Sequence, residues 1–239
     1  MLAGDIAAYE ESTHNFLLSN GKLANGTEGT VNLFDVQPGY SSYYYNTTTT
    51  KRRIVLHYTT GFLGGDISTL TTASSHISVS FVVARNGRIY RLFPTEKWSY
   101  HTGPGTVGGN GTISKSSIGI EISNIGYLDQ AGAWMWNFYG DRYCAVTDNQ
   151  YYTTLPTPFR GKTHYATYTP AQYASVRSLL DVLTAQHAIP RTFLPVANRY
   201  MVFASAAAGQ AYQGICSHVN YRPSGKWDIG PAFDWAAIA

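Results

Sequence analysis

The chain has 239 residues, of which 44% are apolar and 13% are charged, and its formal net charge is +3. This apolar share supports a packed core and excludes a wholly disordered chain, and the length suits one large domain. The basic residues are scattered apart from Lys51-Arg52-Arg53, so no basic stripe points to a nucleic-acid partner. No apolar run reaches the roughly 18–20 residues that a membrane-spanning helix needs.

The first 50 residues differ from the rest of the chain, because they hold few apolar runs and end in the polar stretch Thr47–Thr50. We expect residues 1–35 to form an N-terminal arm with a short helix over Ile6–Leu18, and residues 36–239 to form the domain. The opening residues contain no basic stretch followed by an apolar one, so we expect no secretory signal there.

From Arg53 onward the pattern alternates between strands and helices. Arg53–Thr59 is a short β-rich run, and Asp66 is a suitable N-cap for a helix that extends to about Ser74. The apolar runs Val79–Ala84 and Arg88–Phe93 are joined by Asn86-Gly87, which is the strongest short-range signal for a β-hairpin.

The second half of the chain continues the same alternation. Ser117–Ser123 places isoleucines on one face and Glu121 on the other, as expected of a strand. Thr169-Pro170-Ala171-Gln172 combines an N-cap, an initial proline and a capping-box glutamine, and the helix that it begins stops before Pro190. A last strand is expected over Gly214–His218. These elements predict a single α/β domain with a central mixed sheet flanked by helices.

Two histidines and an aspartate stand where sheet proteins place functional sites. His57 lies at the end of an apolar strand, before a glycine-bearing turn, and His218 precedes a loop that returns Lys226 and Asp228. Two imidazoles and a carboxylate would give catalytic zinc its three protein ligands and leave one position open. The alternatives are a hydrogen-bonded core histidine for His57 and a solvated loop residue for Lys226.

The cysteines offer a competing ligand. Cys216 lies two residues before His218, so a strand would place both on one face, and a thiolate binds zinc well. Two neighbouring ligands on one strand would crowd one side of the metal, so Asp228 is favoured. Cys144 and Cys216 could form one disulfide, but two unpaired buried thiols are the favoured expectation.

Four segments together resemble a known family. The runs IVLHYTTG, SIGIEIS, YTPAQYASVRSLLDVL and HVNYRPSGKWDIGPAFDW resemble the zinc-dependent N-acetylmuramoyl-L-alanine amidases of the amidase-2 type, which are related to bacteriophage T7 lysozyme and to peptidoglycan recognition proteins. The resemblance covers residues 36–239, and residues 127–164 look like an insertion. It implies the α/β fold of T7 lysozyme and of the peptidoglycan recognition proteins.

The resemblance also implies roles for individual residues. His57, His218 and Asp228 match the family's zinc ligands, Glu121 matches the acidic residue that assists the attacking water, and Lys226 matches the lysine beside the metal. The alternative for Glu121 is a polar residue on the solvated face of an edge strand.

Two further residues are candidates for contact with the substrate. His101 lies in a segment, Tyr100–Gly103, that matches a stretch near the family's substrate groove, although a plain loop position is an equal alternative. Tyr58 follows the first predicted ligand and is the second candidate.

The implied reaction is hydrolysis of the amide between the lactyl group of N-acetylmuramic acid and the L-alanine of the peptidoglycan stem. The rivals are a peptidoglycan-binding module that does not cleave, and a zinc amide hydrolase that acts on soluble muropeptides during recycling. A bacteriolytic endolysin of a phage or prophage, or an exported enzyme, is favoured over a cytoplasmic recycling enzyme. The sequence does not indicate an oligomeric state.

An aromatic cluster in the insertion has two interpretations. Trp134, Trp136, Phe138 and Tyr139 could form a carbohydrate-stacking surface or the buried core of a hairpin. Rings exposed at a rim would favour binding.

Overall fold

The computed structural model describes all 239 residues and centres on a seven-stranded sheet. Its strands are, in spatial order, β1 (Leu23–Glu28), β2 (Val31–Val36), β5 (Ile89–Arg91), β4 (Phe81–Val83), β6 (Ser117–Ile122), β3 (Arg53–Tyr58) and β12 (Gly214–Ser217). Strands β4, β6, β3 and β12 are parallel, whereas β5 runs antiparallel to β4 and β1 antiparallel to β2. The sheet is therefore mixed, as predicted.

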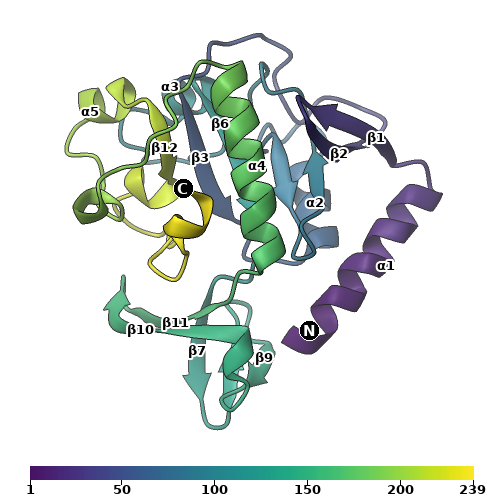
Figure 1. Cartoon of the computed structure of the whole chain (residues 1–239), viewed down its shortest axis with the longest axis vertical. Coiled ribbons are helices and arrows are strands. Elements are labelled where there is room, and N and C mark those ends of the chain that lie inside the picture. Colours follow the sequence, from purple (N-terminus) through teal and green to yellow (C-terminus); the bar gives the residue numbers. More distant parts are fainter.

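Helices cover both faces of this sheet (Figure 1). α4 (Pro170–Gln186) packs its apolar side against one face, where the largest core cluster includes Leu56, Ile120 and Leu180. α2 (Leu63–Leu70) and α3 (Asn110–Lys115) cover the other face, and α5 (Ala206–Ala211) lies beyond α3. Because both faces are covered, the central strands β3 and β6 are almost wholly buried.

Local signals fix several element boundaries. α4 begins with the predicted capping box, in which the Thr169 hydroxyl accepts from the Gln172 N–H and the Gln172 side chain accepts from the Thr169 N–H. The β4–β5 hairpin also forms as predicted. α2 differs from the prediction, because it begins at Leu63 and ends at Leu70, and Asp66 lies inside it. The Asp66 carboxylate instead accepts a hydrogen bond from the Ser123 hydroxyl at 2.8 Å.

Residues 127–166 form a second, five-stranded antiparallel sheet at one end of the molecule (Figure 1). Its strands are β10 (Tyr152–Phe159), β11 (Lys162–Ala166), β7 (Tyr127–Ala131), β8 (Trp134–Trp136) and β9 (Arg142–Ala145). The predicted insertion at 127–164 coincides with this sheet almost to the residue.

The N-terminal segment takes a more regular form than an arm. α1 (Ile6–Ser19) forms where a short helix was predicted, and the hairpin β1–β2 follows it and joins the main sheet through β5. Glu10 and His14 lie on the buried side of α1, where the Glu10 carboxylate accepts a hydrogen bond from the Arg85 N–H at 2.9 Å. The predicted boundary between residues 35 and 36 therefore falls inside β2.

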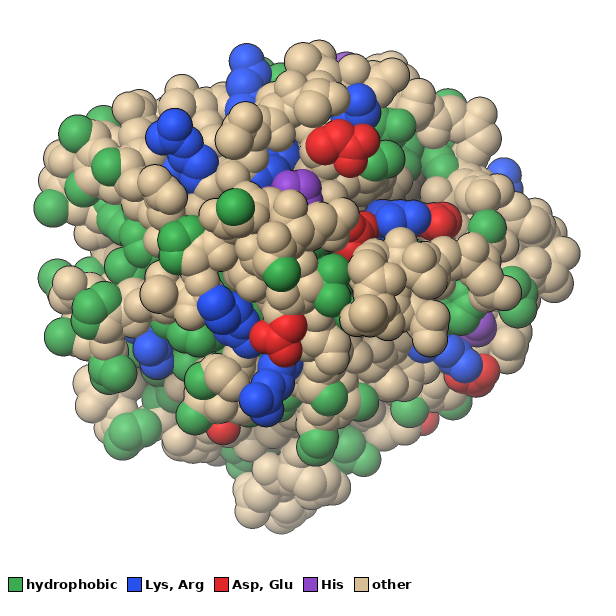
Figure 2. Space-filling view, turned by 45° about the horizontal axis from the view of Figure 1, so that its top comes forward, with side chains coloured by type: hydrophobic (Ala, Val, Ile, Leu, Met, Phe, Trp, Pro, Cys, Tyr) green, Lys and Arg blue, Asp and Glu red, His purple; other side chains and the backbone are tan.

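Three further observations bear on the whole chain. Cys144 and Cys216 are both buried and unpaired, as expected. None of the helices combines the length and the apolar character needed to cross a membrane. On the face shown in Figure 2, basic and acidic side chains are interspersed rather than gathered into one stripe.

Candidate metal centre

The ends of three neighbouring strands position the predicted site. His57 is the penultimate residue of β3, and the strand register places it beside Glu121 of β6. On the other side of β3, Ser217 at the end of β12 pairs with Leu56, so the next residue, His218, lies beside His57. Because side chains in register share a face of a sheet, His57 and Glu121 point to the same side.

The loop after β12 brings the carboxylate to the two imidazoles. Its return is anchored by the Val219 N–H, which donates to the Asp228 carbonyl at 2.8 Å. Asp228 Oδ2 then lies 2.8 Å from His218 Nδ1 and 3.2 Å from His57 Nδ1, and the two Nδ1 atoms are 2.9 Å apart. All three side chains are buried. The structure thus brings together the three residues predicted as zinc ligands.

Hydrogen bonds outside this group determine where the imidazole protons lie. The Ser117 hydroxyl donates to the Ile113 carbonyl at 2.7 Å, so it accepts from His101 Nε2–H at 2.8 Å. Neutral His101 then presents a bare Nδ1, which accepts from His57 Nε2–H at 3.0 Å. His57 Nδ1 is consequently left with its lone pair.

The second ligand is oriented in the same way. His218 Nε2–H donates to the Thr102 carbonyl at 2.8 Å, so a neutral His218 also presents a bare Nδ1. With both imidazoles neutral, two nitrogen lone pairs and a carboxylate oxygen converge on one point. Such a group calls for a cation.

The donor set fits zinc. Zinc–nitrogen bonds of about 2.0–2.1 Å in a tetrahedral site separate two ligand atoms by about 3.4 Å, and the three atoms here are 2.8–3.2 Å apart. Outer hydrogen bonds that fix the tautomer of a ligand histidine are typical of zinc sites. Three protein ligands leave one position open for water or substrate.

The pKa shifts agree with this donor set. Burial, followed by the neighbouring His218, lowers the pKa of His57 to about 4, so its imidazole is neutral. Burial alone would raise the pKa of Asp228, but the neighbouring His218 and His57 outweigh burial and hold it well below its usual range. The centre thus contains a neutral imidazole beside a carboxylate anion, as metal binding requires.

Glu121 lies next to this centre and has the features of an acid–base group. Its Oε2 is buried without a hydrogen-bond partner. Burial, together with the charge of Asp228, raises the pKa of Glu121 well above its usual value, and the positive charge of Lys226 acts in the opposite direction. Since Lys226 also acts on His57, its ammonium lies within electrostatic reach of both residues.

The remaining predicted positions have different surroundings. His101 lies behind His57 and contacts it directly, rather than facing an open groove. Tyr58 is only 6% exposed and belongs to the core beneath α4, so its position gives no support to the predicted substrate contact. Cys216 lies away from the three ligands, packed with Val55 and Ile113.

Several residues that support the centre were not predicted from the sequence. Ser117 and the Thr102 carbonyl orient the imidazoles, and Arg160 of the second sheet holds the loop that carries Asp228. Gly119 also contributes, because a Cβ at this position would lie 3.2 Å from His101 Cγ and 2.7 Å from Val79 Cγ1. The glycine in SIGIEIS was a visible signal for close approach, whereas Arg160 had none.

The comparisons with known proteins agree on one family. A family model described as N-acetylmuramoyl-L-alanine amidase matches residues 47–231. Among curated proteins, the chain is 25% identical over 192 residues to N-acetylmuramoyl-L-alanine amidase AmiD of Escherichia coli, which covers 78% of this chain and 51% of AmiD. The chain therefore spans about half the length of this curated relative.

A solved structure of AmiD shows the same fold, and a second solved structure also aligns with the chain. The complex of AmiD from E. coli with the substrate anhydro-N-acetylmuramic acid-L-Ala-D-gamma-Glu-L-Lys aligns with a TM-score of 0.50 at 19% identity, over 90% of this chain and 64% of AmiD. AmpDh3 from Pseudomonas aeruginosa, solved in complex with anhydromuramic pentapeptide, aligns with a TM-score of 0.49 at 17% identity, over 84% of this chain and 63% of that one.

Proposed function

Because the chain belongs to the N-acetylmuramoyl-L-alanine amidase family, we propose that it hydrolyses the amide between the lactyl group of N-acetylmuramic acid and the L-alanine of the stem peptide. The observation that carries the proposal is the convergence of His57 Nδ1, His218 Nδ1 and Asp228 Oδ2, three buried ligand atoms that lie within 3.2 Å of one another. A module that only binds peptidoglycan has no need of a metal centre with an open position.

The three ligands would hold zinc, and zinc with an open position lowers the pKa of a bound water to about 7 and polarises a carbonyl group. The chain's own residues supply the proton transfers. Glu121 Oε2 has no partner and can take a proton from the attacking water and deliver it to the leaving amine. The raised pKa of Glu121 moves it toward the operating pH, which suits this role.

Lys226 supplies a fixed positive charge. Its ammonium acts on the pKa of both Glu121 and His57, so it lies near the place where the scissile carbonyl would sit. Negative charge that develops on that carbonyl oxygen would be stabilised by such a preorganised cation. Neither Glu121 nor Lys226 is needed to bind the metal.

Two physical forms of the substrate are candidates. The AmiD complex contains a soluble anhydro-muropeptide, so recycling of soluble fragments is a second candidate beside attack on intact cell wall. Action on the wall, as a phage lysin or exported enzyme, stays the favoured prediction.

Mass spectrometry of two digests tests the proposal and separates the candidates. Intact peptidoglycan and soluble muropeptides are each incubated with the protein, with the His218→Ala variant and with the control His164→Ala, which changes a histidine of the second sheet. We expect new L-alanine amines without new reducing sugars from the wild type and the control only. Product from soluble muropeptides alone would favour recycling, and no product from either substrate would contradict the proposal.

A further inference from the structure

Two adjacent aromatic rings are exposed in the turn between β8 and β9 of the second sheet. Phe138 and Tyr139 lie between β8 and β9, with exposed fractions of 56% and 64%. Trp134 and Trp136 of the same aromatic cluster are half-buried, and the guanidinium of Arg142 lies over both rings. Adjacent large apolar side chains exposed to water are a feature of binding surfaces rather than of a hairpin core.

The turn that carries these rings is tightly built. The buried Asn137 side chain accepts hydrogen bonds from the Tyr139 N–H at 3.0 Å and from the Asp141 N–H at 2.9 Å, while its carbonyl accepts from the Gly140 N–H. Gly140 has a φ of 80°, which an L side chain rarely adopts. The two rings are therefore presented to solvent by a fixed backbone, at little further cost in entropy on binding.

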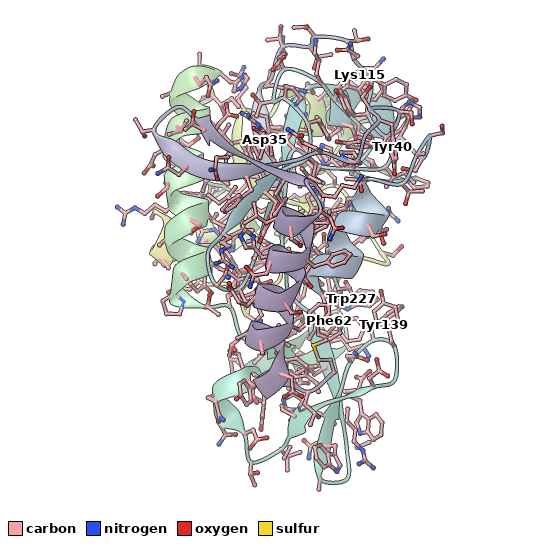
Figure 3. The ribbon with its side chains drawn as sticks, turned by 90° about the vertical axis from the view of Figure 1, so that its right-hand side faces the viewer. Asp35, Tyr40, Phe62, Lys115, Tyr139 and Trp227 are labelled. Carbon is pink, nitrogen blue, oxygen red and sulfur yellow. The ribbon has the colours of Figure 1, made fainter.

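A row of contacts between aromatic rings connects the β8–β9 turn to the candidate metal centre. Phe138 contacts Tyr127 with ring centroids 6.1 Å apart, and Tyr127 contacts Trp227 at 4.9 Å, directly before the ligand Asp228. Tyr139 extends the row and lines a pocket of about 300 Å³ together with Glu121 and residues of α2. Figure 3 shows Tyr139, Phe62 and Trp227 gathered at the junction of the two sheets.

The lining of this pocket suits a neutral, hydroxyl-rich ring. Phe62, Leu70 and Tyr139 give it apolar walls, and Thr59 and Thr69 add hydroxyl groups. Its volume lies at the lower end of the range of small-molecule sites, about 300–1,000 Å³. A pyranose ring presents apolar C–H faces to aromatic rings and hydroxyl groups to polar side chains.

The charges around the centre favour one orientation of the substrate. The acidic groups Asp66 and Glu121 lie on the β6 side of β3. The basic groups lie on the β12 side: Arg222 and Lys226 belong to the loop that follows β12, and Arg160 contacts that loop. The free carboxylates of a stem peptide are attracted to the basic side. The uncharged sugar, on the other side of the scissile amide, would then lie on the side of Asp66 and Glu121.

We propose that Phe138 and Tyr139 form a stacking subsite for a sugar ring of the glycan, on the lactyl side of the amide that is cleaved. This subsite belongs to the second sheet and reaches the same pocket as Glu121. The proposal rests on the proposed function for the identity of the sugar, and it makes the second sheet a determinant of substrate choice.

Steady-state kinetics on a matched pair of substrates tests the subsite. One substrate is a soluble muropeptide with its sugar, and the other is the lactyl peptide without it. For Tyr139→Ala, the ratio of kcat/KM between the two substrates should fall about 3- to 10-fold, the effect expected of one aromatic contact. Tyr139→Phe should retain the ratio, and Phe16→Ala, which removes a 65% exposed ring on α1, serves as the control.

Two results would overturn the subsite. An unchanged ratio in Tyr139→Ala and in the Phe138→Ala, Tyr139→Ala double variant excludes stacking on sugar, and an equal loss on both substrates assigns the rings to the peptide. Calorimetry measures the affinity for a peptide-free glycan fragment. Because this binding requires no cleavage, it tests the subsite independently of the proposed function. If the wild type cleaves neither substrate, weaker glycan binding by Tyr139→Ala still supports the subsite, and equal binding overturns it.

Discussion

The proton position on each imidazole of the metal centre depends on a residue outside the centre. Ser117 fixes the tautomer of His101, and His101 in turn fixes that of His57, through bonds of 2.8 Å and 3.0 Å. Burial, followed by the neighbouring His57 and His218, lowers the pKa of His101 well below its usual value, which keeps His101 neutral. His101 is thus a positioning residue, in addition to any contact with substrate.

Replacement of His101 should weaken metal binding. In His101→Ala, His57 Nε2–H loses its acceptor and the ring is free to turn, so we expect zinc affinity to fall about 10- to 100-fold. Competition with a chromophoric chelator measures the affinity. The control is His187→Ala, a histidine that bonds to Thr95 instead. Equal affinity in His101→Ala and the wild type would show that the relay does not orient His57.

Glu121 should act in turnover and not in metal binding. Glu121→Gln keeps the shape of the side chain but removes the proton acceptor, and loss of a general base typically lowers kcat by about 10²–10⁴-fold. Zinc content should stay that of the wild type, because Glu121 is outside the three-ligand group. Kinetics with a parallel metal assay checks both statements. Near-normal turnover would move the proton transfer to another residue.

At the scale of elements, the second sheet holds the loop that carries Asp228. Arg160, in the turn between β10 and β11, donates to the carbonyls of Lys226 at 2.5 Å, Arg222 at 2.8 Å and Val219 at 3.3 Å. Trp227 Nε1–H in turn donates a hydrogen bond to the Arg160 carbonyl at 3.1 Å. One guanidinium therefore fixes both ends of the loop, because it can donate in several directions at once.

Loss of this clamp should loosen the metal centre without unfolding the chain. Arg160→Ala removes several charge-assisted hydrogen bonds, and the loss of one or two corresponds to a zinc affinity about 10- to 100-fold lower. The zinc affinity of Arg160→Lys should lie between those of Arg160→Ala and the wild type, since an ammonium cannot reproduce the planar, forked hydrogen bonding of a guanidinium. Arg142→Ala, an exposed arginine of the same sheet, is the control in chelator competition. Wild-type affinity in Arg160→Ala would show that the loop keeps its shape unaided.

The N-terminal helix should make stability depend on pH. Burial raises the pKa of Glu10 from 4.5 to about 7, so the folded protein binds its proton more tightly than the unfolded chain does. The free energy of unfolding should decrease as the pH rises from about 4.5 to 7, by up to about 3 kcal/mol from this group. Denaturant unfolding of the wild type and Glu10→Gln measures it. Equal pH slopes in the two proteins would contradict the argument.

Elements with strong local signals were predictable, and elements that depend on distant partners were not. The capping box at Thr169 and the Asn86-Gly87 turn specify α4 and the β4–β5 hairpin without reference to the rest of the chain. β1 has little apolar character of its own, and the hairpin that it forms with β2 is placed by the pairing of β2 with β5. Residues 23–35, which were predicted to belong to an N-terminal arm, therefore lie in the main sheet.

The candidate site divides in the same way. His57, His218 and Asp228 were predicted from their positions at strand ends and from the family resemblance, and the structure brings them together. Arg160 lies about 60 residues before the loop that it holds, and nothing in a turn arginine identifies its partner. Contacts of this kind follow from the packing of the two sheets and not from a local pattern.

At the scale of the whole molecule, the metal centre lies where the two sheets meet. The main sheet supplies His57 and Glu121 from adjacent strands, and the loop after β12 supplies His218, Lys226 and Asp228. The second sheet adds Arg160, which holds that loop, and the exposed ring of Tyr139, which lines the same pocket as Glu121. In the proposed function, the large sheet would carry the chemistry and the small one would adapt the site to its substrate.

The dependence of muropeptide hydrolysis on zinc tests the central claim most directly. The protein is stripped of metal with a chelator, and product is measured by mass spectrometry before and after one equivalent of zinc is added. We predict that the stripped protein is inactive and that zinc restores the wild type but not His218→Ala, which lacks one of the three converging ligands. Full activity in the stripped protein, or restoration in His218→Ala, would contradict the account.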